Sequence, residues 1–319
     1  EDDKLVPFSN VQTCNWLQVQ DNAADQFHHT PLHTTALVPG HEQGTTFGEA
    51  GAAAFVIRPD LQFFPVHGGR SMAWTSSRRV DDDYIFIRIN HQILPNLSFH
   101  SYLFEDGKKS KHFSRIHMHR WTVPIDDTNC KMIGWRAIGP NIDPRDVGNE
   151  DLVGFEKIDF LEGQCGIRRP ERAKYKDGKL PPIPKHHRER DCYNDAQHAP
   201  GDYEATASQR PIAVHALENP MKFDGGVYLS RKQLRDATTG SNPAATGAGW
   251  KEWLEGVDGK PNTYCSGNVL KVPIGSTPEE EVERRRVVAQ RCIQAITDAD
   301  RERASGPAFA NNNADNRGA

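Results

Sequence analysis

The chain has 319 residues, of which 36% are hydrophobic and 26% charged, and its net charge is −4. This size allows one large domain or two small ones, and the scattered basic residues give no indication of a nucleic-acid or membrane-surface partner. No apolar run reaches the roughly eighteen residues that a membrane-spanning helix needs, and the acidic first residues do not resemble a signal peptide. We therefore expect a soluble, cytoplasmic globular protein.

The cysteines are widely spaced, and no two of them form a C-x-x-C pair. This pattern disfavours both a disulfide framework and a cysteine-rich metal site, and a reducing compartment is the simplest interpretation. The six positions are Cys14, Cys130, Cys165, Cys192, Cys265 and Cys292.

The first predicted element is a helix over residues 11–37, which Pro31 interrupts near its end. A glycine-rich loop is expected over residues 39–51. From about residue 53 to residue 136, runs of β-branched and aromatic residues are separated by turn-forming pairs, and they predict an antiparallel meander. Its strands are expected at residues 84–90, 99–104, 114–123 and 131–135.

Residues 137–201 are rich in proline, glycine and charge, which is typical of a functional loop or of disorder. Helical character returns at residues 202–218 and 230–237. The tail over residues 305–319 is rich in Asn, Ala and Gly, and we expect it to be disordered. Residues 1–304 are therefore expected to form one domain.

The last predicted helix, over residues 277–304, has the clearest signals. Thr277 is a suitable N-cap, Pro278 fits the first helical position, and Glu280 completes a capping box. One apolar stripe, in which residues recur every four positions, is predicted to be buried. It consists of Val288, Cys292 and Ile296.

Asp25, His28 and His33 form the strongest candidate site. Asp25 and His28 would share one face of a helix, and the bend at Pro31 would swing His33 toward His28. Two imidazoles and a carboxylate from elsewhere form the facial triad of a non-haem iron(II) site, which leaves positions open for oxygen and substrate. The chain has 14 histidines, so this spacing also arises by chance, and the adjacent His29 is either a ligand or a surface residue.

The segment Cys14–Gln18, followed by this D-x-x-H-x4-H motif, resembles the start of the catalytic domain of Rieske non-haem iron aromatic-ring oxygenases. It is most similar to the branch that contains phthalate and phenoxybenzoate oxygenases and aromatic O-demethylases. Residues 121–128 (WTVPIDDT) and 202–212 (DYEATASQRPI) also resemble this branch. The resemblance covers roughly residues 8–300.

The resemblance implies a role for each residue of the motifs. His28, His33 and Asp202 would bind the iron, while Asp25 would bridge a ligand to a histidine of the Rieske cluster in a neighbouring subunit. Asp195 is the fallback for Asp202, because Gly201 and Arg210 replace the glutamine and glycine of the family's motif.

Asn22 could hydrogen-bond near the iron. Asp21 could orient a metal-binding histidine by accepting a hydrogen bond from the ring nitrogen that does not bind the metal. Helix capping is an equally good interpretation of both residues. Arg88 and Arg120 could pair with a substrate carboxylate, although charges on the solvent face of the sheet are the preferred interpretation.

His117 and His119 form an H-x-H pair, which could serve as the ligands of a cupin-like iron dioxygenase. Polar residues that line a cavity or face solvent are the preferred interpretation.

The resemblance implies an α+β helix-grip fold, in which a curved antiparallel sheet surrounds a long C-terminal helix. It implies hydroxylation or O-demethylation of an aromatic, carboxylated substrate by mononuclear Fe(II) and O2. Electrons would come from a reductase or ferredoxin through a Rieske [2Fe–2S] centre in a homotrimer. A non-catalytic ligand-binding domain of the same fold, or an inactive fragment, is the alternative.

The cluster-binding motifs of the family, C-x-H and C-x-x-H, are absent from this sequence. We therefore expect either that the chain is a fragment of a longer oxygenase or that another polypeptide supplies the cluster.

Overall fold

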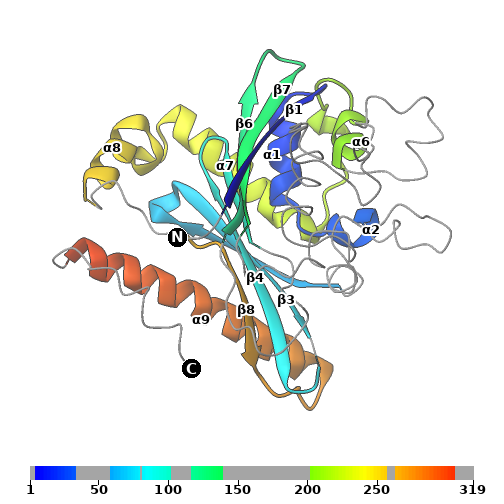
Figure 1. The fold of residues 1–319 in the computed structure, drawn as a ribbon, viewed down its shortest axis with the longest axis vertical. Coiled ribbons are helices and arrows are strands. Elements are labelled where there is room, and N and C mark those ends of the chain that lie inside the picture. Colours follow the sequence, from blue (N-terminus) through cyan, green and yellow to red (C-terminus); the bar gives the residue numbers. More distant parts are fainter. Residues whose placement is uncertain are drawn as a thin grey trace, which may run out of the picture.

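An antiparallel sheet of eight strands forms the centre of the protein in a computed structural model, with helices on both of its faces (Figure 1). The structure describes residues 4–33, 58–79, 81–101, 116–138, 202–256 and 263–305. The predicted loop at residues 39–51, almost all of the segment 137–201 and the predicted tail beyond Ser305 lie outside these ranges.

The strands follow the order β1-β7-β6-β5-β4-β3-β2, and β8 pairs with β4. The predicted meander is confirmed, because β2 to β7 are neighbours in chain order and all their pairs are antiparallel. The strands are β1 (Lys4–Gln12), β2 (Asp60–Val66), β3 (Ser71–Arg79), β4 (Tyr84–Ile93), β5 (Leu97–Ser101), β6 (Ile116–Pro124), β7 (Cys130–Ile138) and β8 (Ser266–Lys271).

Strand β4 is shared by three partners. β3 pairs with it along one side, while on the other side β8 pairs with Tyr84–Ile89 and β5 with His91–Ile93. The sheet therefore divides at this strand, and the segment that begins at β8 continues from there into the last helix.

The described helices are α1 (Trp16–Ala24), α2 (His29–His33), α6 (Asp202–Ala207), α7 (Gly225–Thr239), α8 (Gly247–Gly256) and α9 (Pro278–Ser305). Single 3-10 turns lie at His67–Gly69, His215–Leu217, Lys222–Asp224 and Pro243–Ala245. The helix predicted at residues 202–218 is wrong beyond α6.

The prediction of one helix over residues 11–37 is also wrong. Residues 4–12 form a strand, and the helix starts only after Asn15, whose Oδ1 accepts a hydrogen bond from Leu17 N at 3.0 Å. The break comes at Asp25 rather than at Pro31, because the Asp25 side chain bonds the next backbone N–H groups and ends α1.

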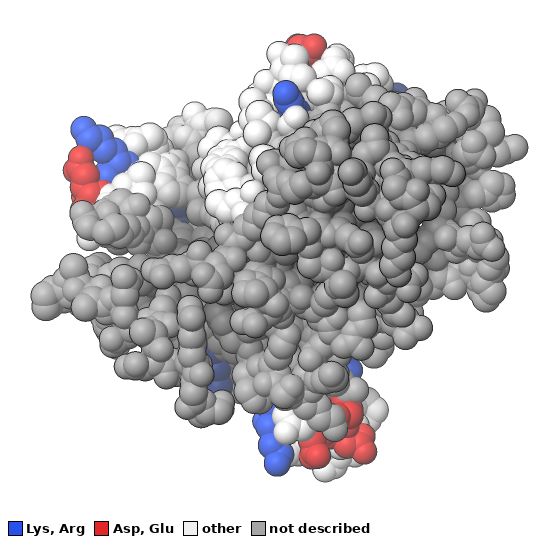
Figure 2. Space-filling model, in the orientation of Figure 1, with Lys and Arg blue, Asp and Glu red and all other residues white. Residues whose placement is uncertain are grey.

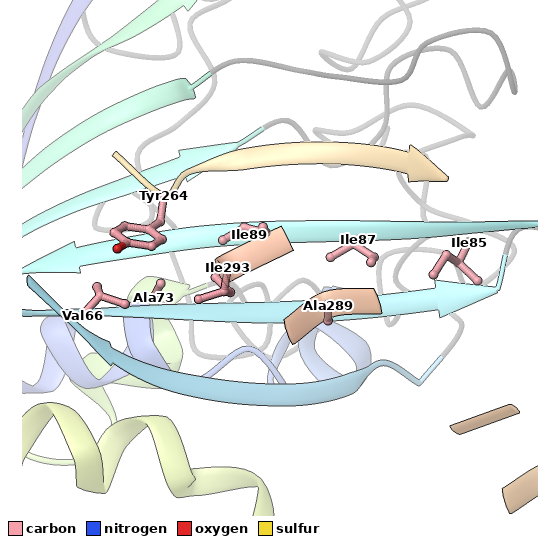
Figure 3. Packing of buried hydrophobic residues seen from close by; sticks show 8 residues of the cluster. All are labelled: Val66, Ala73, Ile85, Ile87, Ile89, Tyr264, Ala289 and Ile293. Atoms are coloured by element: carbon pink, nitrogen blue, oxygen red, sulfur yellow. The ribbon is translucent and has the colours of Figure 1, made fainter. Parts of the chain in front are cut away.

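Helix α9 covers one face of the sheet (Figure 3). Ile85, Ile87 and Ile89 alternate along β4 and pack with Ala289 and Ile293 of the helix. The predicted stripe of Val288, Cys292 and Ile296 packs against this cluster while remaining partly exposed.

The predicted N-cap of α9 is confirmed, since Thr277 Oγ1 accepts from Glu280 N at 3.2 Å. The Glu280 carboxylate accepts from Ser276 N at 2.7 Å, one residue before the position that a capping box requires.

Helices α1 and α7 cover the opposite face. Met72 and Trp74 of β3 pack there with Ala24 of α1 and Val227 of α7. These contacts confirm an α+β fold built on a large antiparallel sheet.

On the face shown in Figure 2, described charged side chains gather over α8 and at the lower end of the molecule, with both signs in each group. No helix of the described ranges is long and apolar enough to cross a bilayer.

Candidate metal centre

The turn between α1 and α2 presents His28. Asp25 closes α1, with its backbone N–H donating to Asp21 O at 2.9 Å. Its Oδ1 accepts from Phe27 N at 2.8 Å and from His28 N at 3.2 Å. The prediction that Asp25 and His28 share one face of a helix is therefore wrong. A turn that is held by the Asp25 side chain brings them together instead.

The imidazole of His28 has a defined tautomer. Its Nδ1 hydrogen-bonds the backbone carbonyl of Asp25. Because a carbonyl can only accept, Nδ1 carries the proton and the neutral ring keeps its lone pair on Nε2. This is the orientation that metal-binding histidines usually have.

His28 Nε2 lies 3.3 Å from Asp202 Oδ1, although the two residues are far apart in the sequence. Asn22 Nδ2 lies 3.5 Å from the same nitrogen. Both Nε2 of the neutral ring and a carboxylate oxygen are electron-pair donors, so a proton or a metal ion between them would make this contact favourable.

The charges around His28 favour a cation at this point. Burial would lower the pKa of His28, but the Asp202 carboxylate and Asp25 outweigh it and raise that pKa. Burial raises the pKa of the Asp25 carboxyl, and the neighbouring His28 partly opposes this shift. The His28 side chain is 13% exposed and that of Asp202 is 47% exposed, although the Asp202 oxygen that faces His28 is itself buried.

Asp202 is held in place by the binding of its helix to α1. Gln18 Nε2 donates to the carbonyls of Thr206 and Arg210, each at 3.0 Å, and Gln18 Oε1 accepts from Ala213 N at 2.9 Å. Sequence reasoning missed Gln18, because a glutamine in an amphipathic helix is ordinarily expected to face solvent.

The other predicted ligands are only partly described. His33 ends α2, but its side chain lies outside the described positions, as does the whole of Asp195. Among the described side chains, no group of three histidine, cysteine or carboxylate residues is arranged so that it could hold a metal ion. His28 and Asp202 are brought together, and their donor atoms fit an imidazole–carboxylate metal site.

Asn22 and Asp21 lie inside α1, so the capping interpretation is wrong for both. Asp21 pairs with Arg231 of α7 at 2.5 Å, and Arg231 also holds Glu218 at 2.8 Å. This ion triad fixes α7 beside α1.

The sheet face beneath α1 carries buried polar residues that the sequence analysis missed. Asn90 Nδ2 donates to Gln26 Oε1 at 3.1 Å, and Asn90 Oδ1 accepts from Ser101 N at 3.1 Å. Polar residues that alternate along a strand usually indicate a solvent face, and here α1 covers that face.

Arg88 and Arg120 were predicted to be charges on the solvent face of the sheet, and this is wrong. They are only 6% and 8% exposed. Arg88 donates to Ser101 O at 3.0 and 3.3 Å. Nε and Nη2 of Arg120 find no hydrogen-bond partner among the described residues. Burial lowers the pKa of Arg120, and the charge of Asp202 works against that shift.

His119 belongs to a different environment from His28. Its ring lies 5.1 Å from both Phe99 and Trp135, its register neighbours on β5 and β7. Since side chains alternate along β6, His119 points away from the face that carries Arg120. The side chain of His117 lies outside the described positions.

No protein-family model matches the chain. Over 240 residues it is 37% identical to the tert-butanol monooxygenase / tert-amyl alcohol desaturase oxygenase subunit of Aquincola tertiaricarbonis, covering 75% of this chain and 46% of that protein. It is 25% identical to the phenoxybenzoate dioxygenase subunit alpha of Ectopseudomonas oleovorans over 234 residues, covering 73% of this chain and 43% of that one. The chain thus spans about half the length of these curated relatives.

Among solved structures, dicamba monooxygenase bound to 3,6-dichlorosalicylic acid matches 73% of this chain and 59% of its own, with 12% identity and a TM-score of 0.38. Apo dicamba monooxygenase gives a TM-score of 0.34 at 10% identity, covering 74% of this chain and 58% of its own. Similarity at this level carries no weight for the function.

Proposed function

We propose that this chain, a homologue of the alpha subunits of Rieske-type oxygenases, forms the part of such an enzyme that binds mononuclear iron(II). His28, His33 and Asp202 would hold the metal, and Asp25 would connect the site to the electron donor. The reaction would be O2-dependent hydroxylation of a small organic substrate. The helix-grip description is part of this proposal, supported by the long helix α9 on one face of a large antiparallel sheet.

One observation carries the proposal. His28 Nε2 and Asp202 Oδ1, both predicted ligands from distant parts of the chain, lie 3.3 Å apart. The hydrogen bond from Nδ1 to the Asp25 carbonyl directs the lone pair of Nε2 toward that carboxylate. A protonated histidine would satisfy the pair without a metal, which is why the first experiment measures metal binding.

Residues of this chain would perform the remaining tasks. The turn of Asp25 fixes the position and tautomer of His28, and Gln18 holds the helix that carries Asp202. The Asn22 amide lies within 3.5 Å of His28 Nε2 and could orient a polar ligand there. Bound iron(II) would supply the reductive activation of dioxygen, because a facial triad leaves coordination positions open.

The electrons would come from a Rieske [2Fe–2S] centre in another polypeptide or in protein beyond this sequence, supplied in turn by a reductase or ferredoxin. The side chain of Asp25 is 28% exposed beside His28, which supports a role at the interface with that donor. A homotrimer is the assembly that such a path between subunits would use.

The substrate class stays a proposal. One relative is named for tert-butanol and tert-amyl alcohol and the other for phenoxybenzoate. An aromatic carboxylate is supported by Arg120, whose buried Nε and Nη2 find no hydrogen-bond partner among the described residues. Buried N–H groups without an acceptor are costly, and a carboxylate matches the fork of N–H groups.

The first test is the iron content of protein reconstituted with iron(II) under anaerobic conditions. We expect about one iron per chain in the wild type, since one facial triad binds one ion, and a clear loss in His28→Ala and in Asp202→Ala. His215→Ala is the matched control, because His215 is 52% exposed and pairs with Glu218. It should bind iron like the wild type.

Iron-free wild-type protein after reconstitution would reject the proposed function and leave a ligand-binding domain or an inactive fragment. Iron that His28→Ala retains but His119→Ala loses would support the cupin-like alternative instead.

The second test is calorimetric binding of benzoate and of benzamide, which has the same shape without the charge. Benzoate should bind more tightly, and Arg120→Met should remove that preference while the iron content stays unchanged. Equal binding of both ligands by the wild type would reject the carboxylate substrate without affecting the iron site.

A further inference from the structure

Two cysteines that are distant in the sequence meet beside the candidate metal centre. Cys14 lies in the turn between β1 and α1, and Cys130 begins β7, where it pairs with Gln12 of β1. Both are completely buried in one apolar cluster with Val19. Their side chains pack in the same cluster, and each thiol shifts the pKa of the other. The proposed metal centre uses neither thiol.

The surroundings make the two thiols unequal. The neighbouring Cys130 thiol, and after it the Thr206 hydroxyl, outweigh burial and lower the pKa of Cys14. The same contact with Cys14, together with burial, raises the pKa of Cys130. Cys14 is therefore the stronger nucleophile of the pair, because a thiolate reacts and a thiol does not.

We propose that Cys14 and Cys130 are a redox pair that hydrogen peroxide converts to a disulfide. The Cys14 thiolate attacks one peroxide oxygen and becomes a sulfenic acid, while the other oxygen leaves as hydroxide and is protonated to water. The Cys130 sulfur then attacks the sulfenic sulfur, forming the S–S bond and releasing a second water. Two thiols lose two electrons, and one peroxide gains them.

The disulfide would act on the helix that carries Asp202. Thr206 Oγ1 donates to Asp202 O at 2.8 Å, and the same hydroxyl helps to lower the pKa of Cys14. A disulfide has no S–H group and draws the two sulfur atoms to about 2.05 Å. Cys14 would therefore move toward Cys130 and away from Thr206. We expect α6 to be held less firmly in the oxidised protein.

The test is peptide mass spectrometry of the whole chain after treatment with peroxide, followed by denaturation and alkylation of the remaining thiols. We expect one cross-linked peptide pair joining Cys14 to Cys130, which dithiothreitol separates. Cys265 is the internal control, because it is buried (5% exposed) but lies in no described thiol pair. Its thiol should survive the peroxide treatment and be recovered in alkylated form. In Cys14→Ser the cross-link should vanish and Cys130 should be alkylated.

If Cys14 and Cys130 are both recovered in alkylated form, while a free thiol peptide in the same tube is oxidised, the pair is not a redox site. Separate sulfinic acids on the two cysteines would reject it equally. Because Cys14→Ser could also disturb folding, Cys130→Ala is the second variant, and both are compared with the wild type by circular dichroism.

Hydrogen exchange tests the effect on α6. The amides of residues 202–207 should exchange faster in the oxidised wild type than in the reduced protein, whereas those of α8 should not change. Equal exchange in α6 after complete disulfide formation would reject the coupling. None of these results requires iron, so they are independent of the proposed oxygenase function.

Discussion

At the residue scale, Asp25 has a structural task that can be separated from any role of its charge. Its Oδ1 accepts the two N–H groups that shape the turn before His28. An asparagine keeps this oxygen and loses the charge, whereas an alanine loses both. Comparing the two variants therefore separates the role of the Asp25 side chain in the turn from the role of its charge in electron transfer.

We predict that Asp25→Asn binds iron like the wild type but loses most turnover coupled to a Rieske electron donor. Asp25→Ala should bind iron about tenfold more weakly, since two lost hydrogen bonds cost at least about 1.4 kcal/mol. Iron titration and substrate oxidation measure the two effects. If Asp25→Asn loses iron, the carboxylate is a ligand and the proposed role is wrong.

At the scale of elements, the contact of α7 with its neighbours depends on a glycine. A Cβ at Gly226 would lie 2.4 Å from Phe63 and 2.7 Å from the Ala24 carbonyl, at the end of α1. Gly247, at the start of α8, has nothing within 4 Å of the same position. The two glycines form a matched pair.

We predict that Gly226→Ala lowers the free energy of unfolding by about 1–3 kcal/mol, because α7 has to move away from α1. Gly247→Ala should be neutral or slightly stabilising. Urea unfolding measures both. Equal stability of the two variants would show that α7 does not pack as closely on α1 as described.

Helix α9 is fixed to the sheet by a partly buried ion pair. Arg79 of β3 donates to both oxygens of Glu281, at 2.9 and 2.6 Å. Burial alone would raise the pKa of Glu281, but the hydrogen bonds from Arg79 and Gly275 outweigh it and lower that pKa. The stability that this carboxylate contributes is therefore present above its ordinary pKa of about 4.3 and is lost as the pH falls through the lower folded value.

We predict that Glu281→Gln destabilises the protein by about 1–3 kcal/mol near pH 6. The difference should be smaller at an acidic pH well below the ordinary carboxyl pKa of about 4.3, as the wild-type carboxylate becomes protonated. Glu279→Gln removes the same charge from an exposed position of the first turn and should have little effect at either pH. A difference between Glu281→Gln and wild type that does not change with pH would contradict the assigned ionisation.

Parts of this architecture were predictable because local chemistry determines them. The meander and the cap of α9 depend on short-range patterns, namely alternation, turn pairs and Thr277. The end of α1 was not predictable from the apolar pattern, because one hydrogen-bonding side chain, Asp25, overrides it. The polar face of β4 was also misleading: Arg88 and Asn90 suggest a solvent-exposed face, yet both are buried in the folded protein.

The candidate site was predictable to a different degree. The motif around His28 was visible as a local spacing, and Asp202 was found only through the resemblance to a family. The contact of Cys14 with Cys130 could not be found from spacing, since it arises from the pairing of β1 with β7.

At the scale of the whole molecule, the apolar core and the candidate metal site lie on opposite faces of the sheet. The apolar core with α9 lies on one face. On the other face lies α1, which precedes the turn that carries His28 and is hydrogen-bonded to α6, the helix of Asp202. Changes in the core should therefore alter stability without altering the metal site.

We predict that Ile293→Ala, which truncates a side chain only 6% exposed, lowers the free energy of unfolding by about 2–5 kcal/mol. Its affinity for cobalt(II), an optical substitute for iron(II), should equal that of the wild type at a temperature where both are folded. Arg291→Ala, at an exposed position of the same helix, should change neither quantity. A parallel loss of cobalt affinity in Ile293→Ala would show that the two faces are coupled.

The side chain of Gln18 has a consequence for the order of assembly. Its amide binds three backbone groups of the segment 206–213, all from a part of the chain synthesised long after α1. Closing so long a loop is entropically costly and is repaid only after the intervening strands have paired. We therefore expect His28 and Asp202 to meet late in folding, so that the nascent chain carries a finished sheet before it carries a finished metal centre.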